Sequence, residues 1–387
     1  MYVGSLAARA FRTESRLKMT QAVSEESMAT LGAQLGLHGI DRRKFMQYSA
    51  TITAMLALPP AFAPQVAAAL TAVDKPTLVW LNFQDCAGNS EALLRARDPD
   101  VATIILDLLS VDYMEVVMTA SGHQAEAAKD AAVARGGHIV VVEGSIPLKD
   151  DGIYCAIGGK SAIQIINEAT KGAAAVLAIG TCATYGGLPA AKPNPTGAVG
   201  VEGLVNGVPV INIPTCPANA DNITAVIAHY LTFKTLPAVA DIGRPLFAFG
   251  DRIHDNCPRR GHFDAGQFAL AFGDEGHRKG WCLYKLGCKG PSTFANCPSQ
   301  QYNGHTNWPI GVGAPCVGCS EPNFWDTMTP IYDRLPRIAG MDASTTADRV
   351  GTLAVTALAT GLAVHGAAKI TSHKREAASH AAKQTQE

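Results

Sequence analysis

The sequence has little charge and few aromatic side chains. Only 17% of its 387 residues are charged, 6% are aromatic, and the formal net charge is −1. Basic residues form no stripe interleaved with aromatics, the pattern typical of nucleic-acid-binding proteins, so no nucleic-acid partner is expected. Hydrophobic residues make up 47% of the chain. This composition and length predict a globular protein with a large core and about two domains.

Cysteine is unevenly distributed. Six of the ten cysteines follow His254, which stands at HxxC spacing from the first of them. A chain of this size needs no disulfide framework, and CxxC and HxxC are spacings of metal ligation. The seven residues are His254, Cys257, Cys282, Cys288, Cys297, Cys316 and Cys319.

The segment that carries these seven residues is rich in Gly, Pro and Asn and has little predicted regular structure, so a metal cluster would act as its core. Seven ligands make one four-ligand and one three-ligand site. Structural zinc is closed by four ligands and fits this number poorly. One cubane and one three-iron cluster fit it.

The first 75 residues look like a leader. Arg42-Arg43 precede an apolar run, 48–70, which contains the small-residue triplet Ala61-Phe62-Ala63 before Pro64. Paired arginines, an apolar stretch and an AxA-like site are the parts of a twin-arginine export signal. The alternative is an N-terminal extension with an ordinary hydrophobic helix, in a cytoplasmic protein.

Four apolar, β-branched runs follow, and each precedes a helical candidate. This alternation favours a doubly wound α/β domain with a parallel sheet. After the first run, Asn89 or Ser90 is the expected N-cap of a helix. The predicted strands span residues 78–83, 138–142, 174–179 and 208–213.

Three further cysteines, Cys86, Cys182 and Cys216, each come directly after a predicted strand. Ligands of open α/β sheets gather at the carboxyl ends of strands, so these thiols are expected to converge. Gly88 and Gly187 would let the backbone approach a cluster closely. The alternative for each cysteine is simple packing in the core.

The segments WLNFQDCAGNSE, VVEGSIP, GTCATYGG, IPTCP, HDNCP, CLYKLGCKGP, FANCP, NWPI and CVGCSEPNFWD, in this order, resemble the small subunit of a [NiFe] hydrogenase. The resemblance implies a flavodoxin-like domain at 76–240 that holds a proximal cluster, and an irregular medial and distal cluster domain at 241–335. It also implies a heterodimer with a large subunit, which holds the Ni–Fe centre.

The resemblance also implies the ligands of each cluster. His254, Cys257, Cys282 and Cys288 would hold a distal [4Fe–4S] cluster. Cys297, Cys316 and Cys319 would hold a medial [3Fe–4S] cluster, for which the family places a proline where this chain has Pro309.

The proximal [4Fe–4S] site departs from the family's CxGC motif, because this chain reads Cys86-Ala87-Gly88-Asn89. This variant resembles the actinobacterial-type, oxygen-insensitive uptake subgroup. Asp85 is our candidate for the fourth ligand, beside Cys86, Cys182 and Cys216. The alternatives are a three-iron cluster with no fourth ligand, or substitution by Cys155.

The last segment, 336–387, contains an uncharged stretch at 350–368 followed by basic residues. Its length and flank permit a membrane anchor. A helix at a subunit interface is the alternative, and residues from 377 onward read as a frayed tail.

The sequence therefore predicts the membrane-associated electron-transfer subunit of an uptake hydrogenase, which passes electrons to a quinone or cytochrome. The sequence lacks the two CxxC pairs, one near each end of the chain, that are expected of the nickel-binding large subunit. Two alternatives remain: an iron–sulfur subunit of a related quinone-reducing complex, and a zinc-stabilised interaction module.

Overall fold

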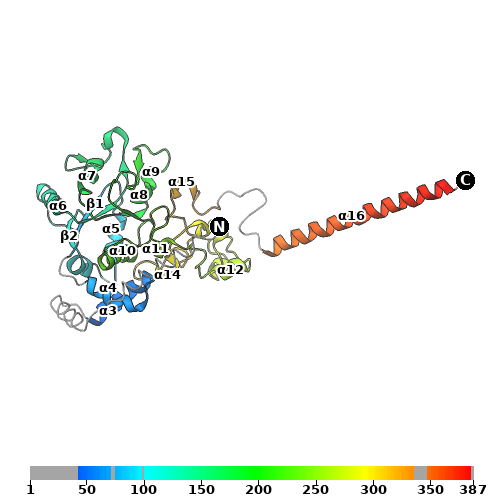
Figure 1. The fold of residues 1–387 in the computed structure, drawn as a ribbon, viewed down its shortest axis with the longest axis horizontal. Coiled ribbons are helices and arrows are strands. Elements are labelled where there is room, and N and C mark those ends of the chain that lie inside the picture. Colours follow the sequence, from blue (N-terminus) through cyan, green and yellow to red (C-terminus); the bar gives the residue numbers. More distant parts are fainter. Residues whose placement is uncertain (1–41, 71–74, 98–99, 335–346, 385–387) are drawn as a thin grey trace, which may run out of the picture.

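The computed structural model describes residues 42–70, 75–97, 100–334 and 347–384. Five parallel strands form one sheet in the order β2-β1-β3-β7-β9 (Figure 1). They are β1 (Thr77–Asn82), β2 (Ser110–Met114), β3 (Ile139–Glu143), β7 (Ala175–Ile179) and β9 (Val210–Ile213). Numbered by themselves along the chain they follow 2-1-3-4-5, the flavodoxin-like order. The predicted doubly wound α/β domain is confirmed.

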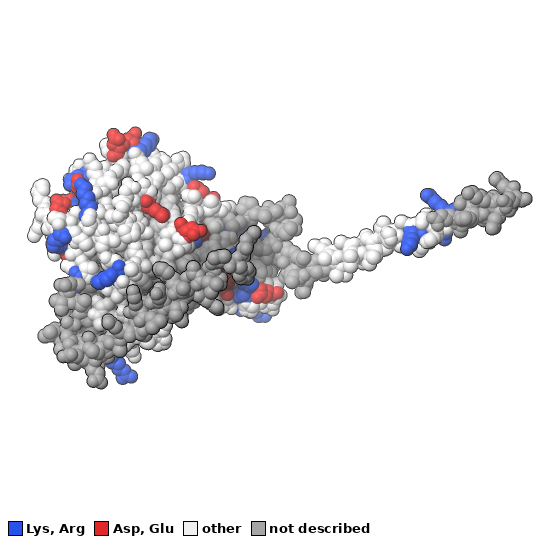
Figure 2. All heavy atoms as spheres, viewed as in Figure 1, with Lys and Arg blue, Asp and Glu red and all other residues white. Residues whose placement is uncertain are grey.

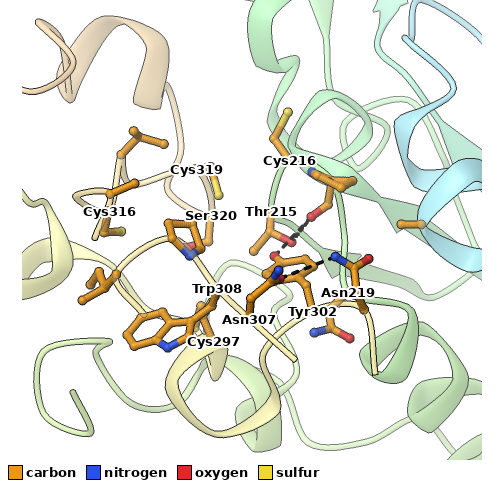
Figure 3. A pocket seen from close by; sticks show the side chains of 18 of the residues that line it. Thr215, Cys216, Asn219, Cys297, Tyr302, Asn307, Trp308, Cys316, Cys319 and Ser320 are labelled. Carbon is orange, nitrogen blue, oxygen red and sulfur yellow. Dashed lines mark hydrogen bonds between the residues drawn. The ribbon is translucent and has the colours of Figure 1, made fainter. Parts of the chain in front are cut away.

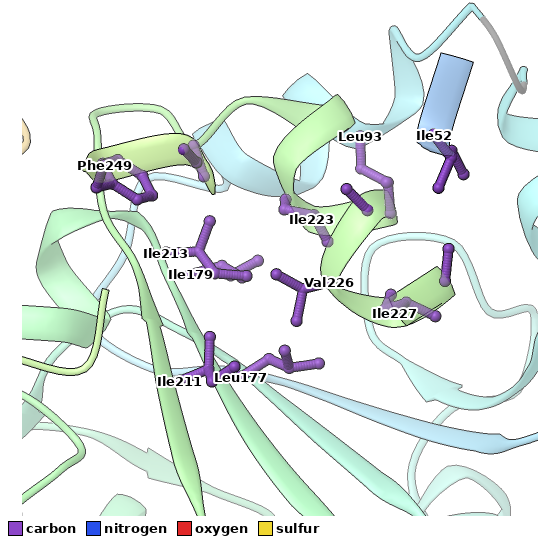
Figure 4. Packing of buried hydrophobic residues seen from close by; sticks show 14 of the residues in the cluster. Ile52, Leu93, Leu177, Ile179, Ile211, Ile213, Ile223, Val226, Ile227 and Phe249 are labelled. Carbon is purple, nitrogen blue, oxygen red and sulfur yellow. The ribbon is translucent and has the colours of Figure 1, made fainter. Parts of the chain in front are cut away.

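Helices cover both faces of this sheet. Successive strand residues point to opposite faces, so Trp80 packs with α5 (Gly88–Leu94) and α10 (Ala220–Phe233), whereas its neighbour Leu81 packs with α6 (His123–Arg135) and α7 (Ala162–Ala169). Figure 4 shows the first of these cores, where Leu177 and Ile211 of the sheet face α10. Because neither face meets water, the strands are nearly continuous apolar runs.

Local signals explain several helix ends. Ser161 and Gln164 form a reciprocal capping box at the start of α7. The side chain of Asn219 accepts from the backbone N–H of Asp221 at the start of α10. Both satisfy backbone donors that the first helical turn leaves open.

The apolar run that the sequence assigned to a leader folds into α3 (Arg42–Met55) and α4 (Ala63–Leu70), separated by the 3-10 turn η1 (Pro60–Phe62). Val66 is fully buried and Ile52 almost so, in the same core as the sheet. The rings of Phe62 and Phe233 lie edge to face with centroids 6.1 Å apart. Burial of a side chain such as Val66 or Ile52 stabilises the fold by about 1.5–3 kcal/mol. The hydrophobic run therefore packs on α10, and residues 1–40 lie outside the described residues.

Residues 241–334 contain only short helices and turns, with no named strand within that range. Two reciprocal hydrogen bonds, of 3.1 and 2.8 Å, join the side-chain amides of Asn222 on α10 and Asn296. Thr181 donates its hydroxyl to the carbonyl of Cys319. The irregular region is thus fastened to the carboxyl edge of the sheet. Its helices are α11 (Leu246–Phe249), α12 (Arg260–Asp264), α13 (Glu275–Arg278), η4 (Tyr284–Leu286), η5 (Gly290–Ser292), α14 (Cys297–Gln300) and α15 (Phe324–Thr327).

The last element, α16 (Ala347–Gln384), projects away from the rest of the molecule as a single helix (Figure 1). Its part from Leu353 to Arg375 is long and apolar enough to cross a membrane, by length and composition alone. Figure 2 shows this uncharged stretch followed by a group of basic side chains. The helix continues to Gln384, past the point where the sequence predicted a frayed tail.

The remaining elements are short and connect those above. They are η2 (Thr103–Leu108), β4 (Ile146–Pro147), η3 (Lys149–Gly152), β5 (Ala156–Ile157), β6 (Lys160–Ser161), α8 (Gly180–Tyr185), α9 (Gly187–Ala190) and β8 (Ala198–Val199).

Candidate metal centres

The three cysteines that follow strands lie at one edge of the sheet. Cys86 lies between β1 and α5, Cys182 lies in α8 directly after β7, and Cys216 follows β9. A Cβ atom added at Gly88 would lie 3.1 Å from the sulfur of Cys86 and 3.9 Å from Pro217 Cβ. The loops of Cys86 and Cys216 therefore touch, as the strand positions predicted.

Electrostatics also place these thiols together. The pKa of Cys182 is raised to about 11, first by burial and further by the neighbouring Cys216, Cys86 and Asp85. A thiol with so high a pKa is neutral at pH 7, whereas metals bind the thiolate. Binding of cationic iron at this edge would favour the thiolate forms and release protons.

Asp85 stands at the same edge. Its Oδ2 accepts from Asn82 Nδ2 at 2.8 Å, and its Oδ1 accepts from the Ala87 backbone at 3.0 Å. The residue is exposed, yet partial desolvation of its carboxyl group is the largest cause that raises its pKa. The Asn82 hydrogen bond lowers this pKa, and the charge of Glu143 raises it. Each carboxylate oxygen has two lone-pair sites, so both retain capacity for a metal.

Cys155, the alternative ligand, belongs to the other side of the sheet. It is partly buried and packs against the core formed with α6 and α7. Burial raises its pKa to about 11, with further increases from Asp85 and Glu115. Cys155 is therefore close enough to Asp85 for the carboxylate to affect its pKa, although its side chain packs against the core.

The predicted N-cap role of Asn89 and Ser90 is wrong, because α5 begins earlier, at Gly88, with Ala87 in the capping position. Both side chains bond instead to the buried carboxylate of Glu143. Sequence reasoning missed this arrangement, since Asn and Ser before an apolar run have the same pattern as ordinary caps.

The medial cysteines line a cavity of about 660 Å³. Cys297 starts α14, and Cys316 and Cys319 lie in the loop that faces it (Figure 3). Pro309 lines the same cavity. Burial raises the pKa of Cys319 to about 12, and the neighbouring Cys297 raises it further. The sulfurs of Cys297 and Cys319 are therefore close together. The cavity extends to Cys216, so the proximal and medial sets adjoin.

The four expected distal ligands line a second, smaller cavity together: His254, Cys257, Cys282 and Cys288. Burial raises the pKa of Cys282 to about 11, and the neighbouring Cys288 and Cys257 raise it further. Burial lowers the pKa of His254, as does Arg260. A neutral imidazole is the form that binds metals. The ring of Phe263 lies edge to face with that of His254, at 4.6 Å.

All ten cysteines are free of disulfide bonds. Within the described residues, no three Cys, His, Asp or Glu side chains are close enough to hold a single metal ion. The thiols instead surround cavities, and their soft sulfur donors suit iron–sulfur clusters. The fold and these donor sets define a flavodoxin-like protein with an irregular, cysteine-rich region at 241–334.

Comparisons with known proteins agree with the resemblance to a [NiFe] hydrogenase small subunit. The family described as the C-terminal part of the NiFe/NiFeSe hydrogenase small subunit matches residues 249–332, and NADH ubiquinone oxidoreductase, 20 Kd subunit, matches residues 86–230. The quinone-reactive Ni/Fe-hydrogenase small chain of Wolinella succinogenes is 45% identical over 84% of this chain and 95% of its own length. The uptake hydrogenase small subunit of Azotobacter vinelandii is 42% identical over 87% of this chain and 94% of its own.

The actinobacterial-type NiFe-hydrogenase structure from Ralstonia eutropha H16 superposes with a TM-score of 0.65 at 26% identity, covering 76% of this chain and 92% of that one. The chain therefore belongs to the small-subunit family of [NiFe] hydrogenases. It is the electron-transfer subunit, and the catalytic site sits in the partner large subunit. This membership confirms the resemblance and sets the zinc-module alternative aside.

Replacing Gly187 tests the proximal edge. A Cβ added there would lie 2.5 Å from the sulfur of Cys182, and the backbone φ of +54° disfavours any side chain. We expect Gly187→Ala to lower iron and acid-labile sulfide per subunit by about four. The matched control is Gly203→Ala, where an added Cβ would meet nothing within 4 Å. Full iron content in Gly187→Ala would contradict the placement of a cluster beside Cys182.

Proposed function

We propose that this chain relays electrons from H2 oxidation in the large subunit through three iron–sulfur clusters. The proximal [4Fe–4S] cluster would be held by Asp85, Cys86, Cys182 and Cys216. The medial [3Fe–4S] and distal [4Fe–4S] clusters would be held by the ligands that the family resemblance implies. When bound, these clusters supply one-electron carriers.

The observation that carries this proposal is the continuity of the three donor sets. Cys216 lines the same cavity as Cys297, Cys316 and Cys319, so the proximal and medial sets are neighbours. The carbonyl of Cys316 accepts from the backbone N–H of Lys289, next to Cys288, at 2.8 Å, so the medial and distal sets are neighbours as well. This continuity of the donor sets, from Cys86 to His254, supports the proposed electron relay.

The alternative prediction, an iron–sulfur subunit of a related quinone-reducing complex, is reflected in the match of the 20 Kd oxidoreductase family to residues 86–230. That match ends before His254. The hydrogenase-specific match over 249–332 covers all seven remaining ligands and favours the hydrogenase.

A membrane quinone or cytochrome is the acceptor that we propose. The Wolinella relative is described as quinone-reactive. In this chain, the uncharged stretch of α16 would hold the complex at a membrane, next to such an acceptor.

The iron content and EPR spectra of the native complex, purified without oxygen, test the cluster assignment. We expect about 11 irons in this subunit and one three-iron signal in the oxidised state. In Asp85→Ala, the loss of one ligand should leave a second three-iron signal and about 10 irons. Zinc without visible absorbance would overturn the relay altogether.

Cys155→Ser is the matched control for Asp85→Ala. Because Cys155 packs in the core on the far side of the sheet, its variant should retain the iron content and EPR spectrum of the native protein. An Asp85→Ala protein with unchanged iron, beside a Cys155→Ser protein that has lost it, would transfer the ligand role to Cys155.

We also propose export by the twin-arginine route, directed by Arg42-Arg43. Processing before Pro64 would remove α3 but leave nearly all of α4 packed on α10. N-terminal sequencing of the native subunit should therefore find a start near Pro64. Recovery of peptides from 42–55 in the native complex would contradict this processing.

Truncation tests the membrane anchor. A chain that ends at residue 346 lacks α16, and we expect its complex to move from the membrane to the soluble fraction with unchanged iron content. Removing only 376–387 retains the stretch Leu353–Arg375 and serves as the control. Membrane retention of the longer truncation after a high-salt wash would assign the attachment to another part of the complex.

A further inference from the structure

Asn89 occupies the position at which the family's usual motif has its second proximal cysteine. Its side chain is buried, with 7% of the residue exposed. Its Nδ2 donates to Glu143 Oε1 at 3.1 Å, and its Oδ1 accepts from the Ala218 backbone at 2.7 Å. Both ends of the amide are therefore engaged by protein groups, one at the end of β3 and one beside Cys216.

The same amide also meets the third cysteine-bearing segment. A Cβ added at Gly180, the first residue of α8, would lie 2.5 Å from both terminal atoms of the Asn89 side chain. Cys182 follows two residues later. One side chain thus contacts the segments that carry Cys182 and Cys216, while its own backbone belongs to the loop of Cys86.

Glu143 completes the arrangement. It is fully buried, and its carboxylate accepts from the backbone N–H groups of Asn89, at 2.8 Å, and Ser90, at 3.1 Å. The Ser90 hydroxyl and the Trp80 ring N–H donate to it as well, at 2.5 and 3.3 Å. Asn82 Nδ2 bridges Glu143 and Asp85, at 3.1 and 2.8 Å. Asp85 is therefore connected to the same buried carboxylate.

We propose that Asn89 is a positioning residue, not a ligand, and that its amide holds the three cysteine-bearing segments at the spacing of the proximal site. This inference rests on the proposed function, in which Cys86, Cys182 and Cys216 hold a cluster. A buried carboxylate that is satisfied entirely by neutral donors is rigid, and each lost partner leaves a buried polar group unpaired. The hydrogen bonds of Asn89 therefore replace the constraint that a fourth thiolate ligand would impose on these segments through iron.

Two substitutions separate this role from direct ligation. Asn89→Ala removes both hydrogen bonds of the side chain. Asn89→Asp keeps the side-chain size and the acceptor for Ala218, but it places a second carboxylate against Glu143 in place of a donor. A carboxylate is a better iron ligand than an amide, so ligation predicts retention of the cluster in Asn89→Asp, whereas positioning predicts its loss.

The measurement is iron per small subunit with EPR of oxidised and reduced samples, on the native complex. We expect both variants to fall from about 11 irons to about 7, with loss of the proximal signal. The medial and distal signals should remain, and they report that the subunit is folded. Asn206→Ala, in an exposed loop, is the matched control and should retain all signals.

A proximal signal that persists in Asn89→Ala, or that persists with altered shape in Asn89→Asp, would overturn the inference. If the alanine variant does not accumulate, the aspartate variant decides in the same way. If the unsubstituted complex lacks a proximal signal, the proposed function fails instead, so the two failures are distinguishable.

Discussion

The parallel sheet is the constraint on which the rest of this structure depends. Parallel strands run in one direction, so their carboxyl ends bring segments that are far apart in the chain to the same edge of the sheet. β1, β7 and β9 deliver Cys86, Cys182 and Cys216 to this edge, and β3 delivers Glu143. The cysteine-rich region then joins the same edge through Thr181 and Cys319. The position of the cysteine-rich region is therefore set by the sheet.

The cysteine-rich region depends on a different physical effect. Residues 241–334 have no strand and only short helices, so their backbone offers little cooperative stability of its own. Their thiols are buried, and burial raises the pKa of Cys282 to about 11 and of Cys319 to about 12. Metal binding couples deprotonation of these groups to folding, so this region and its clusters are expected to form together.

Much of the fold could be predicted from the sequence, because strands covered on both faces are continuous apolar runs. The predicted runs at 138–142 and 174–179 coincide with β3 and β7 within one residue. β2 was missed because Ser110 and Asp112 interrupt its pattern, as an edge strand allows. The apolar run from 48 to 70 was assigned to a leader by composition, which carries no information about the α10 surface on which it packs.

The candidate site, like the fold, could be predicted only in part. The convergence of Cys86, Cys182 and Cys216 could be predicted, because strand ends determine it. The role of Asn89 could not, because it depends on a carboxylate 54 positions away and on a backbone N–H 129 positions away. Neither partner is visible in a local motif.

The hydrogen bonds of Asn89 suggest how a proximal site with three cysteines in place of four can keep its geometry. A thiolate ligand constrains its loop through the metal, so the constraint exists only when the metal is bound. Hydrogen bonds from Asn89 to Glu143 and from Ala218 to Asn89 act in the protein alone. These hydrogen bonds can therefore place the loops before iron arrives, and the same network reaches Asp85, the proposed fourth ligand, through Asn82.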